Sequence, residues 1–375
     1  MRIVYLSTHL PRECGIATFN NSLIKGIEAN LRKKHLYVQH SVVALNDSDD
    51  LHEYEYSQEV KFIIRQENER DYLKAAQLIN NSNTDVCVLE HEFGIFGGQS
   101  GIYILPLLHR LEKPVVTVLH TVLKDPSFIQ KIIIQEIAKQ SAKLIVFNKK
   151  AIDFLTSIYN VSAEKIELIE HGVPDLEPPI SNPVKNFTSF RNRKLLMTFG
   201  LINRGKGLET VIRALPKVVA KHPDTLYAII GNTHPAVLKA RGEEYRDSLK
   251  LLASELKVDK HLVFINRFLP ERELINYLSA ADIYITPYLN EAQISSGTLS
   301  YAIGAGAATI STPYWHASEL LSDNRGLLFD FRDSNALANL VNDLFDRPEK
   351  LAELKDNAYQ YGKHLRWPNI AGKYL

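Results

Sequence analysis

The chain has 375 residues, of which 45% are hydrophobic and 23% are charged, and this length is better explained by two domains than by one hydrophobic core. Its 44 Lys and Arg residues nearly balance 43 Asp and Glu, so the formal charge of +1 provides no overall field to attract nucleic acid or an anionic bilayer. Only Cys14 and Cys87 are present, which excludes a disulfide framework and a four-cysteine zinc site.

The first residues contain too few apolar side chains for a secretory signal and are typical of a buried strand. No stretch reaches the roughly 18 apolar residues that are needed to span a bilayer, so we expect a cytoplasmic protein. An apolar helix face between residues 128 and 137 lies in a chain that also has a basic helix near residues 25–34. The apolar face either packs on the core or gives weak peripheral contact with the inner face of a membrane.

Short apolar runs alternate with amphipathic stretches along the chain, which is typical of βα units around parallel sheets. The first series of expected strands comprises Arg2–Ser7, His40–Leu45, Asp85–Glu90, Pro114–His120, Lys143–Phe147 and Ile166–Ile169. The second series comprises Leu195–Gly200, Thr225–Gly231, His261–Asn266, Ile283–Pro287, Ala307–Ser311 and Gly326–Phe329. Prolines without periodicity predict a linker between the two series, at Pro174, Pro178, Pro179 and Pro183.

This pattern predicts an α/β protein with two doubly wound, Rossmann-like domains whose strand ends face a central cleft. The expected limits are 1–185 for the first domain and 186–360 for the second. Residues 361–375 are expected to form a helix that packs back on the first domain, with Trp367-Pro368 marking a kink or a new helix start.

Three segments of the first domain place polar residues directly after an expected strand. Gly15 lies where a helix begins and is either part of an anion site or a turn residue. His91, Phe93 and Gly94 follow the third strand, and we favour contact with a donor or an acceptor over a simple turn. His120 ends the fourth strand, where an imidazole can donate or accept a hydrogen bond near neutral pH, although a structural histidine is the alternative.

The second domain begins with a loop that carries glycines and two cations between a strand and a helix. Gly200, Arg204 and Lys206 in this loop can bring amides and positive charge against phosphate oxygens. The spacing differs from that of a Walker loop, so phosphate binding without a P-loop is predicted. A solvated turn with its charges in water is the alternative.

A second polar loop of this domain leads into a helix. Ser295 or Ser296 is a natural N-cap, and first-turn amides following it attract an anion. Glu291 precedes this turn and can accept hydrogen bonds from sugar hydroxyls. The run Asp47-Ser48-Asp49 in the first domain has the spacing of a metal-binding carboxylate pair, but a solvated acidic loop explains it more simply. No metal or other cofactor is expected.

With these residues in place, the chain resembles the retaining glycosyltransferases of the GT-B fold, in the family 4-like group labelled "glycosyl transferases group 1". The resemblance is carried by Phe199-Gly200 with Lys206-Gly207, by Ala280-Ala281-Asp282-Ile283, by Gly304-Ala305-Gly306 and by Ser318-Glu319-Leu320. In the first half it shows at Leu119-His120 and at Glu170-His171-Gly172-Val173.

The resemblance implies a role for each matched position. Arg204 and Lys206 would neutralise the donor diphosphate, and His120 and Glu291 would contact the transferred sugar. These four positions are the expected catalytic residues. The expected donor-binding residues are Gly15, Gly200, Arg267, Phe268, Ser295, Ser296, Gly297, Thr298 and Tyr301, and the expected acceptor-binding residues are His91, Phe93 and Gly94.

Three positions depart from the family pattern. Leu201 stands where the family usually has an arginine, so Arg204 would have to act from a shifted position. The family's two glutamates are separated by seven residues, and Gln293 and Tyr301 occupy those positions here. A phenol offers one hydroxyl where a carboxylate offers two acceptor oxygens, which affects the usual contact with the ribose.

The expected activity is therefore retaining transfer of a hexosyl group from a UDP- or GDP-sugar to a glycan, a glycolipid or another hydroxyl acceptor, in polysaccharide or glycoconjugate synthesis. The expected partners are the nucleotide sugar and a glycan or lipid-linked acceptor, without nucleic acid. Two alternatives stay open: a nucleotide-sugar 2-epimerase of GT-B fold, and a non-catalytic subunit that binds nucleotide sugars.

Overall fold

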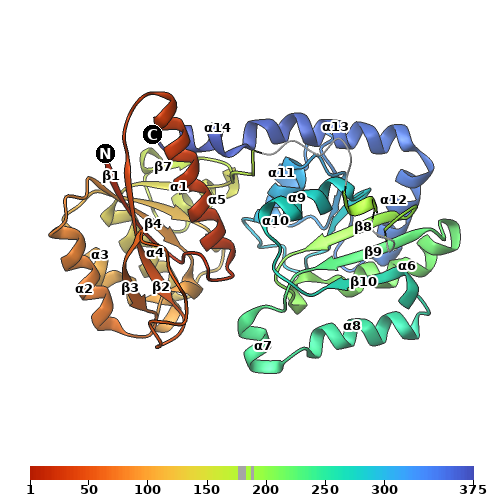
Figure 1. The fold of residues 1–375 in the computed structure, drawn as a ribbon, viewed down its shortest axis with the longest axis horizontal. Helices are drawn as coiled ribbons and strands as arrows, with labels where there is room; N and C mark the ends of the chain where they lie inside the picture. Colours follow the sequence, from red (N-terminus) through yellow and green to blue (C-terminus); the bar gives the residue numbers. More distant parts are fainter. Residues whose placement is uncertain (176–182, 187–189) are drawn as a thin grey trace. The chain divides into compact units, whose positions relative to one another are not determined.

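A computed structural model describes residues 1–175, 183–186 and 190–375 and divides the chain into two compact units (Figure 1). The first unit comprises Met1–Gly172 and Trp367–Leu375, and the second comprises Val173–Arg366. The expected limits at residues 185 and 360 do not coincide with these boundaries. The reason is that Val173 pairs with Arg366 inside the second unit, where its amide donates to the Leu365 carbonyl over 2.9 Å. Pro178 and Pro179 of the expected linker lie outside the described residues.

The described residues of the first unit form a seven-stranded parallel sheet in the order β3-β2-β1-β4-β5-β6-β7. Its strands are β1 (Arg2–Ser7), β2 (Gln39–Asn46), β3 (Val60–Arg65), β4 (Val86–His91), β5 (Val115–Leu119), β6 (Ser141–Val146) and β7 (Ile166–Leu168). Its α-helices are α1 (Gly15–Lys33), α2 (Glu69–Asn80), α3 (Ile104–Leu108), α4 (Phe128–Gln140), α5 (Lys149–Ser157) and α14 (Trp367–Gly372).

The described residues of the second unit form a six-stranded parallel sheet in the order β10-β9-β8-β11-β12-β13. Its strands are β8 (Lys194–Phe199), β9 (Thr225–Ile230), β10 (Leu262–Ile265), β11 (Ile283–Thr286), β12 (Thr309–Ser311) and β13 (Leu327–Leu328). Its α-helices are α6 (Leu208–Lys221), α7 (Pro235–Arg241), α8 (Glu244–Glu255), α9 (Glu271–Ala280), α10 (Gly297–Gly304), α11 (Trp315–Leu320), α12 (Ser334–Asp346) and α13 (Pro348–Leu365).

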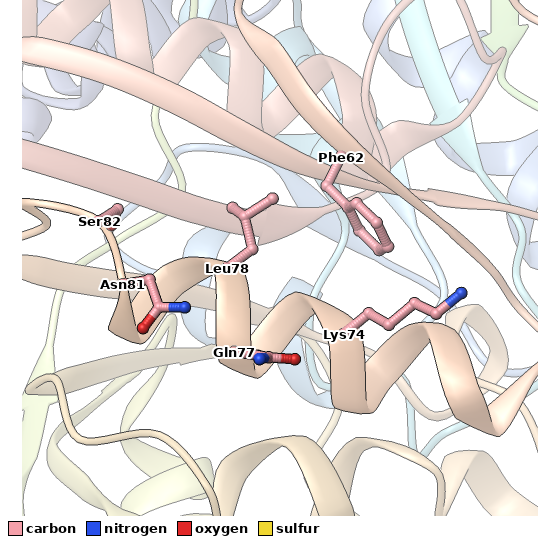
Figure 2. A pocket seen from close by; sticks show the side chains of 6 residues that line it. All are labelled: Phe62, Lys74, Gln77, Leu78, Asn81 and Ser82. Atoms are coloured by element: carbon pink, nitrogen blue, oxygen red, sulfur yellow. The ribbon is translucent and has the colours of Figure 1, made fainter.

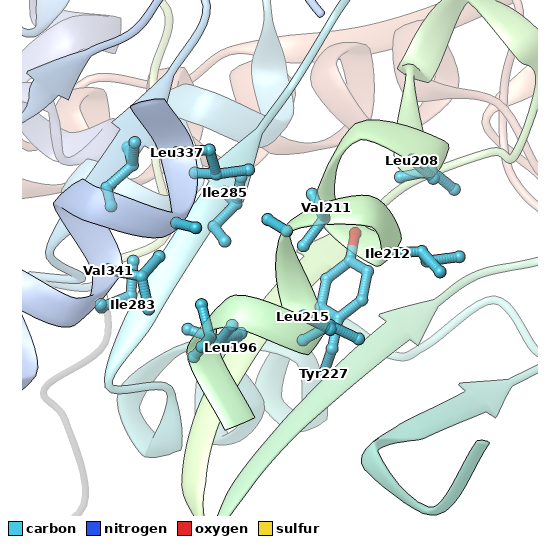
Figure 3. Packing of buried hydrophobic residues seen from close by; sticks show 14 of the residues in the cluster. Leu196, Leu208, Val211, Ile212, Leu215, Tyr227, Ile283, Ile285, Leu337 and Val341 are labelled. Atoms are coloured by element: carbon cyan, nitrogen blue, oxygen red, sulfur yellow. The ribbon is translucent and has the colours of Figure 1, made fainter. Parts of the chain in front are cut away.

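One apolar core of the second unit joins the sheet to α6, α8 and α12. Figure 3 shows Leu196 and Ile283 of the sheet packed with Val211 and Leu215 of α6 and with Val341 of α12. All five side chains are buried. Helices therefore bury the Val, Ile and Leu side chains of these strands.

Both sheets change winding direction at one point, between β1 and β4 in the first unit and between β8 and β11 in the second. Open α/β sheets bind ligands at the carboxyl ends of the strands beside such a point. The predicted α/β class with two doubly wound sheets is thus confirmed, and each unit has its own switch point.

One strand was not predicted. β3 lies at the edge of the first sheet and pairs in parallel with β2, although residues 47–59 between them form no helix. The strands were predicted from the alternation of apolar runs with helical stretches. A parallel strand that follows another strand without a helix between them does not fit this alternation, so β3 was not predicted. A surface pocket lies beside this edge, between Phe62 of β3 and Lys74 and Leu78 of α2 (Figure 2). None of the predicted site residues lines it.

Helix α4 buries its apolar side, with Ile133, Ile134 and Ile137 at 0% exposure, while Phe128 at its start is 79% exposed. The first of the two explanations for this helix, packing on the core, accounts for those three isoleucines. Among the described residues no helix has both the length and the apolar character needed to cross a membrane.

Candidate functional site

The loops after β8 and β11 meet at the switch point of the second unit. After β8 the chain passes through Gly200 and a short 3-10 helix, η5 (Arg204–Lys206), before Gly207 opens α6. Gly207 has φ +62°, and a Cβ there would lie 2.2 Å from the Pro287 carbonyl oxygen, so only glycine allows this approach. The Leu289 amide also donates to the Gly205 carbonyl over 3.0 Å. The predicted cationic loop is therefore fixed against the loop that follows β11.

Lys206 lies in a hydrogen-bonded cluster with Tyr288 and Thr298. Its Nζ donates to the Tyr288 hydroxyl over 2.5 Å and lies 4.1 Å from the centre of that ring. The Tyr288 hydroxyl is 2.7 Å from Thr298 Oγ1, and Thr298 Oγ1 is 3.1 Å from Ser296 Oγ. A Cβ on Gly200 would lie 3.2 Å from Thr298 Cγ2 and 3.5 Å from Lys206 Nζ. Two predicted site segments, the cationic loop and the start of α10, thus come together around Lys206.

The charge of Lys206 acts on Tyr288. Burial alone would raise the pKa of Tyr288, but the Lys206 ammonium and hydrogen bonds from Lys206, Thr298 and Ser296 hold it below its ordinary value. Tyr288 also stacks on Tyr314, with ring centres 5.1 Å apart and planes inclined by 16°. A cation that favours the deprotonated form of a neighbouring phenol can also stabilise the negative charge on a phosphate oxygen.

The start of α10 adjoins this cluster. Ser296 is the N-cap, as predicted, and its hydroxyl accepts from the Leu299 amide over 3.3 Å. The Ser296 amide donates to Nδ1 of His316 over 2.8 Å. First-turn amides such as those of Gly297 and Thr298 have no acceptor within their own helix. They carry the positive end of the helix dipole, which favours an anion beside Lys206.

The other predicted cations occupy more exposed positions. Arg204 is exposed, and its guanidinium pairs with Glu244 over 2.6 Å and lies 5.3 Å from the centre of the Tyr245 ring. Arg267 donates from Nη1 to Glu273 over 3.0 Å, and Phe268 beside it is 36% exposed. Arg204 is therefore engaged with α8, while Lys206 lies in the cluster.

The structure also shows the surroundings of Glu291 and of the two residues that stand where the family has glutamates, Gln293 and Tyr301. Glu291 is exposed, and its carbonyl accepts from the Trp315 amide over 3.0 Å. Gln293 donates from Nε2 to the Ser295 carbonyl over 2.5 Å. Tyr301 is buried, and its hydroxyl donates to Glu271 over 3.1 Å. The phenol that replaces the second glutamate is thus in contact with a carboxylate from the start of α9.

In the first unit, a carboxylate contacts the predicted His120. Glu90, at the end of β4, is 0% exposed and its Oε2 lies 2.8 Å from His120 Nε2. His91 is also 0% exposed, with its ring stacked on Phe96 at 5.7 Å between centres, and Phe93 is 8% exposed. Gly94 is exposed. Of the three predicted acceptor positions, only Gly94 is thus open to solvent, and the other two side chains lie in the core.

The first turn of α1 begins at Gly15, where a Cβ would meet no atom within 4 Å, so packing does not require a glycine there. The preceding loop is fixed by Arg12, which donates to the Leu45 carbonyl over 2.9 Å and pairs with Asp47 over 3.2 Å. Asp47 of the acidic run is therefore paired with a neighbouring loop.

The structure brings Gly200, Lys206, Ser296 and Thr298 together in the second unit, whereas His120 belongs to the first unit. Sequence reasoning did not single out Tyr288, His316 and Glu90, which connect the predicted residues. Each is a common residue type in a loop or at a strand end. The role of each of these residues depends on a partner that the fold brings close and that the sequence does not indicate.

Residues 183–361 match the model of the family "Glycosyl transferases group 1". Over 155 residues, 40% of this chain and 38% of the relative, the chain is 29% identical to the GDP-mannose-dependent alpha-(1-6)-phosphatidylinositol monomannoside mannosyltransferase of Mycolicibacterium smegmatis. Over 254 residues, 63% of this chain and 53% of the relative, it is 24% identical to the D-inositol 3-phosphate glycosyltransferase of Corynebacterium kroppenstedtii. The chain thus spans about two fifths to one half of the length of these curated relatives.

The fold of the whole chain also has solved counterparts. The crystal structure of HepE from Anabaena in complex with UDP and glucose matches with a TM-score of 0.76 and 16% identity, covering 100% of this chain and 98% of that one. The chain therefore has the fold of GT-B glycosyltransferases. The family match is confined to residues 183–361, whereas the likeness of fold extends over the whole chain.

Proposed function

We propose that the chain is a retaining glycosyltransferase that moves a hexosyl group from a UDP- or GDP-sugar to a hydroxyl of a glycan, a glycolipid or a related acceptor. The donor would bind at the switch point of the second unit. The names of the relatives support both donor classes, because one is GDP-mannose-dependent and a protein of similar fold was crystallised with UDP and glucose.

One observation carries the proposal: the position of Lys206. Its ammonium lies in a partly buried cluster with Tyr288 and Thr298, where the loop after β8 meets the start of α10. A diphosphate at this place would receive charge-assisted hydrogen bonds from Lys206 and amide hydrogen bonds from the helix start. Arg204 could add charge only after leaving Glu244.

The chemistry follows from the leaving group. The bond between the anomeric carbon and the phosphate oxygen breaks, and a bond from the acceptor oxygen to the same carbon forms on the same face. The acceptor proton passes to the departing phosphate oxygen. Negative charge grows on the diphosphate as it leaves, so Lys206 and the amides of α10 would stabilise the transition state more than the ground state.

Several finer features belong to the same proposal. Glu291 and His120 would contact hydroxyls of the transferred sugar, and Phe268 would flank the base. Turnover without a metal is expected, so EDTA should leave the rate unchanged.

A thermal-shift panel of nucleotide sugars tests the donor site first. A donor at about 100 times its dissociation constant should stabilise the protein by about 2.7 kcal/mol. Transfer to added glycan acceptors, with the anomeric configuration of the product read by NMR, then tests retention. Conversion of the donor without an acceptor would instead indicate an epimerase, and binding without any turnover would indicate a binding subunit.

Lys206→Ala is the variant that tests the phosphate site. We expect it to weaken binding of UDP or GDP and to lower kcat/KM by about 100-fold, because one preorganised donor to the leaving phosphate is lost. Lys250→Ala is the matched control, since Lys250 on α8 is exposed and pairs with Asp247. Equal nucleotide affinity in both variants, measured by calorimetry, would remove the phosphate-site assignment.

A further inference from the structure

Glu90 is a buried carboxylate, and a carboxylate at a buried position needs a hydrogen-bond or ion-pair partner. It closes β4 with 0% exposure, and its Oε2 lies 2.8 Å from His120 Nε2. Among the described residues its other oxygen, Oε1, has no hydrogen-bond partner. Burial raises the pKa of Glu90, and the hydrogen bond and charge of His120 lower it. Because a buried carboxylate is costly unless it is paired, the contact with His120 is its main compensation here.

Backbone pairing and aromatic packing also restrict the orientation of the His120 ring. Its amide donates to the His91 carbonyl over 2.9 Å, which continues the pairing of β5 with β4. Phe19 packs edge-on against the ring with centres 4.9 Å apart, and Phe147 packs with centres 5.3 Å apart. The ring is therefore packed against aromatic side chains from α1 and from the residue that follows β6, and it is hydrogen-bonded to Glu90 on β4.

We propose that Glu90 is the positioning residue of His120: its carboxylate engages Nε2 and thereby fixes the orientation in which the ring would meet the transferred sugar. The inference deepens the proposed function and rests on it. No proton transfer to Glu90 is involved. The carboxylate selects the tautomer and the orientation of the ring, as a carboxylate behind a histidine commonly does.

Other titratable groups face this pair from several elements. Tyr5 on β1 and Tyr374 at the C-terminus have their pKa values raised by burial and by the charge of Glu90. Burial lowers the pKa of His91 to about 3, with a further contribution from His120. All three side chains are therefore uncharged near pH 7.

The first test follows the ring itself and needs no substrate. In protein labelled with ¹⁵N-histidine, His120→Asn identifies the His120 signals, and the wild-type shifts should report a single tautomer. Glu90→Leu should give a mixture of both tautomers, because the partner of Nε2 is gone. Wild-type nitrogen shifts in Glu90→Leu would overturn the proposal, and this result is independent of whether the protein transfers sugar.

Kinetics provide a second readout, and a second variant covers the case in which Glu90→Leu does not fold. Glu90→Gln keeps the shape and removes the charge, and we expect kcat to fall about tenfold or more while the donor KM changes less than about twofold. Asp71→Asn is the matched control, because Asp71 is another buried carboxylate of the same unit, paired with Arg65 over 2.7 Å. An unchanged kcat in Glu90→Gln, or an equal loss in Asp71→Asn, would contradict the proposal. A wild-type protein inactive with every donor would contradict the proposed function, and the NMR result would still decide the role of Glu90.

Discussion

At the residue scale, the surroundings of His316 keep its ring neutral. The side chain is 4% exposed and its Nδ1 accepts from the Ser296 amide over 2.8 Å, which requires an unprotonated nitrogen. Burial lowers the pKa of His316 to about 4. The ring supports the residue that caps α10, so its protonation state matters for the candidate phosphate site as well as for stability.

This depressed pKa predicts a loss of stability in mild acid. The unfolded chain binds a proton near pH 6.5 and the folded chain only near pH 4, so the unfolded state takes up more protons as the pH falls between these values. Between pH 7 and pH 5 the contribution of His316 to the unfolding free energy should fall by about 2 kcal/mol. His316→Gln keeps an acceptor for the Ser296 amide but does not titrate.

Urea unfolding of both proteins at the two pH values measures this difference. His91 also has a lowered pKa, so the variant should keep part of the pH dependence and lose the share of His316. The prediction is wrong if the two proteins lose the same stability between pH 7 and pH 5.

The chemistry of the candidate site could be predicted at this scale only in part. Lys206 and Ser296 were identified because a cation after a strand and a hydroxyl before a helix have local meaning. Tyr288 and Glu90 were not, because their roles depend on partners 82 and 30 residues away in the sequence. Burial and long-range contacts of this kind have no local signature.

At the scale of elements, the doubly wound order could be predicted because nearly every strand is followed by a helix. β3 was the exception, since a loop without a helix leads into it. The close packing of α10 on α13 was not predicted, because it depends on a glycine from a distant part of the chain, Gly362. A Cβ at Gly362 would lie 2.7 Å from the Ile303 carbonyl oxygen and 2.8 Å from Gly304 Cα.

Gly362→Ala should therefore destabilise the second unit. The added methyl group meets backbone atoms of α10, which cannot rotate away, and such overpacking typically costs about 1 to 3 kcal/mol. The better helix propensity of alanine offsets about 1 kcal/mol of this cost. Because α10 would have to shift, nucleotide affinity should fall together with stability.

Gly372→Ala in α14 is the control for the helix propensity. The nearest atom to a Cβ at Gly372 is the flexible Asn30 side chain at 3.4 Å, so this variant should be neutral or slightly stabilising. Differential scanning calorimetry and nucleotide titration give both quantities. A Gly362→Ala protein with wild-type stability and nucleotide affinity would show that α10 and α13 tolerate a wider separation.

At the scale of the whole molecule, the chain leaves the first unit at Gly172 and returns to it at Trp367. Trp367 is 5% exposed, and its ring packs edge-on against Phe19 with centres 5.1 Å apart. A Cβ at Gly172 would lie 2.5 Å from the Trp367 ring, so the boundary glycine also accommodates this side chain. The return of the C-terminal helix completes the core of the first unit.

Removing this anchor should affect one unit more than the other. Trp367→Ala leaves a cavity beside Phe19 and should destabilise the first unit by about 3 to 5 kcal/mol. UDP or GDP at about 100 times its dissociation constant should still stabilise the second unit by about 2.7 kcal/mol, because Lys206 and α10 lie there. Calorimetry of Trp367→Ala with and without nucleotide should thus show a lowered transition that the ligand does not move and a second one that it raises. Tyr37→Ala is the control, because it removes an aromatic side chain that is 96% exposed in the same unit. It should leave both transitions at their wild-type temperatures.

A single transition that responds to both the mutation and the ligand would contradict this prediction. It would mean that the two units unfold together, because neither core is then stable enough to fold without the other.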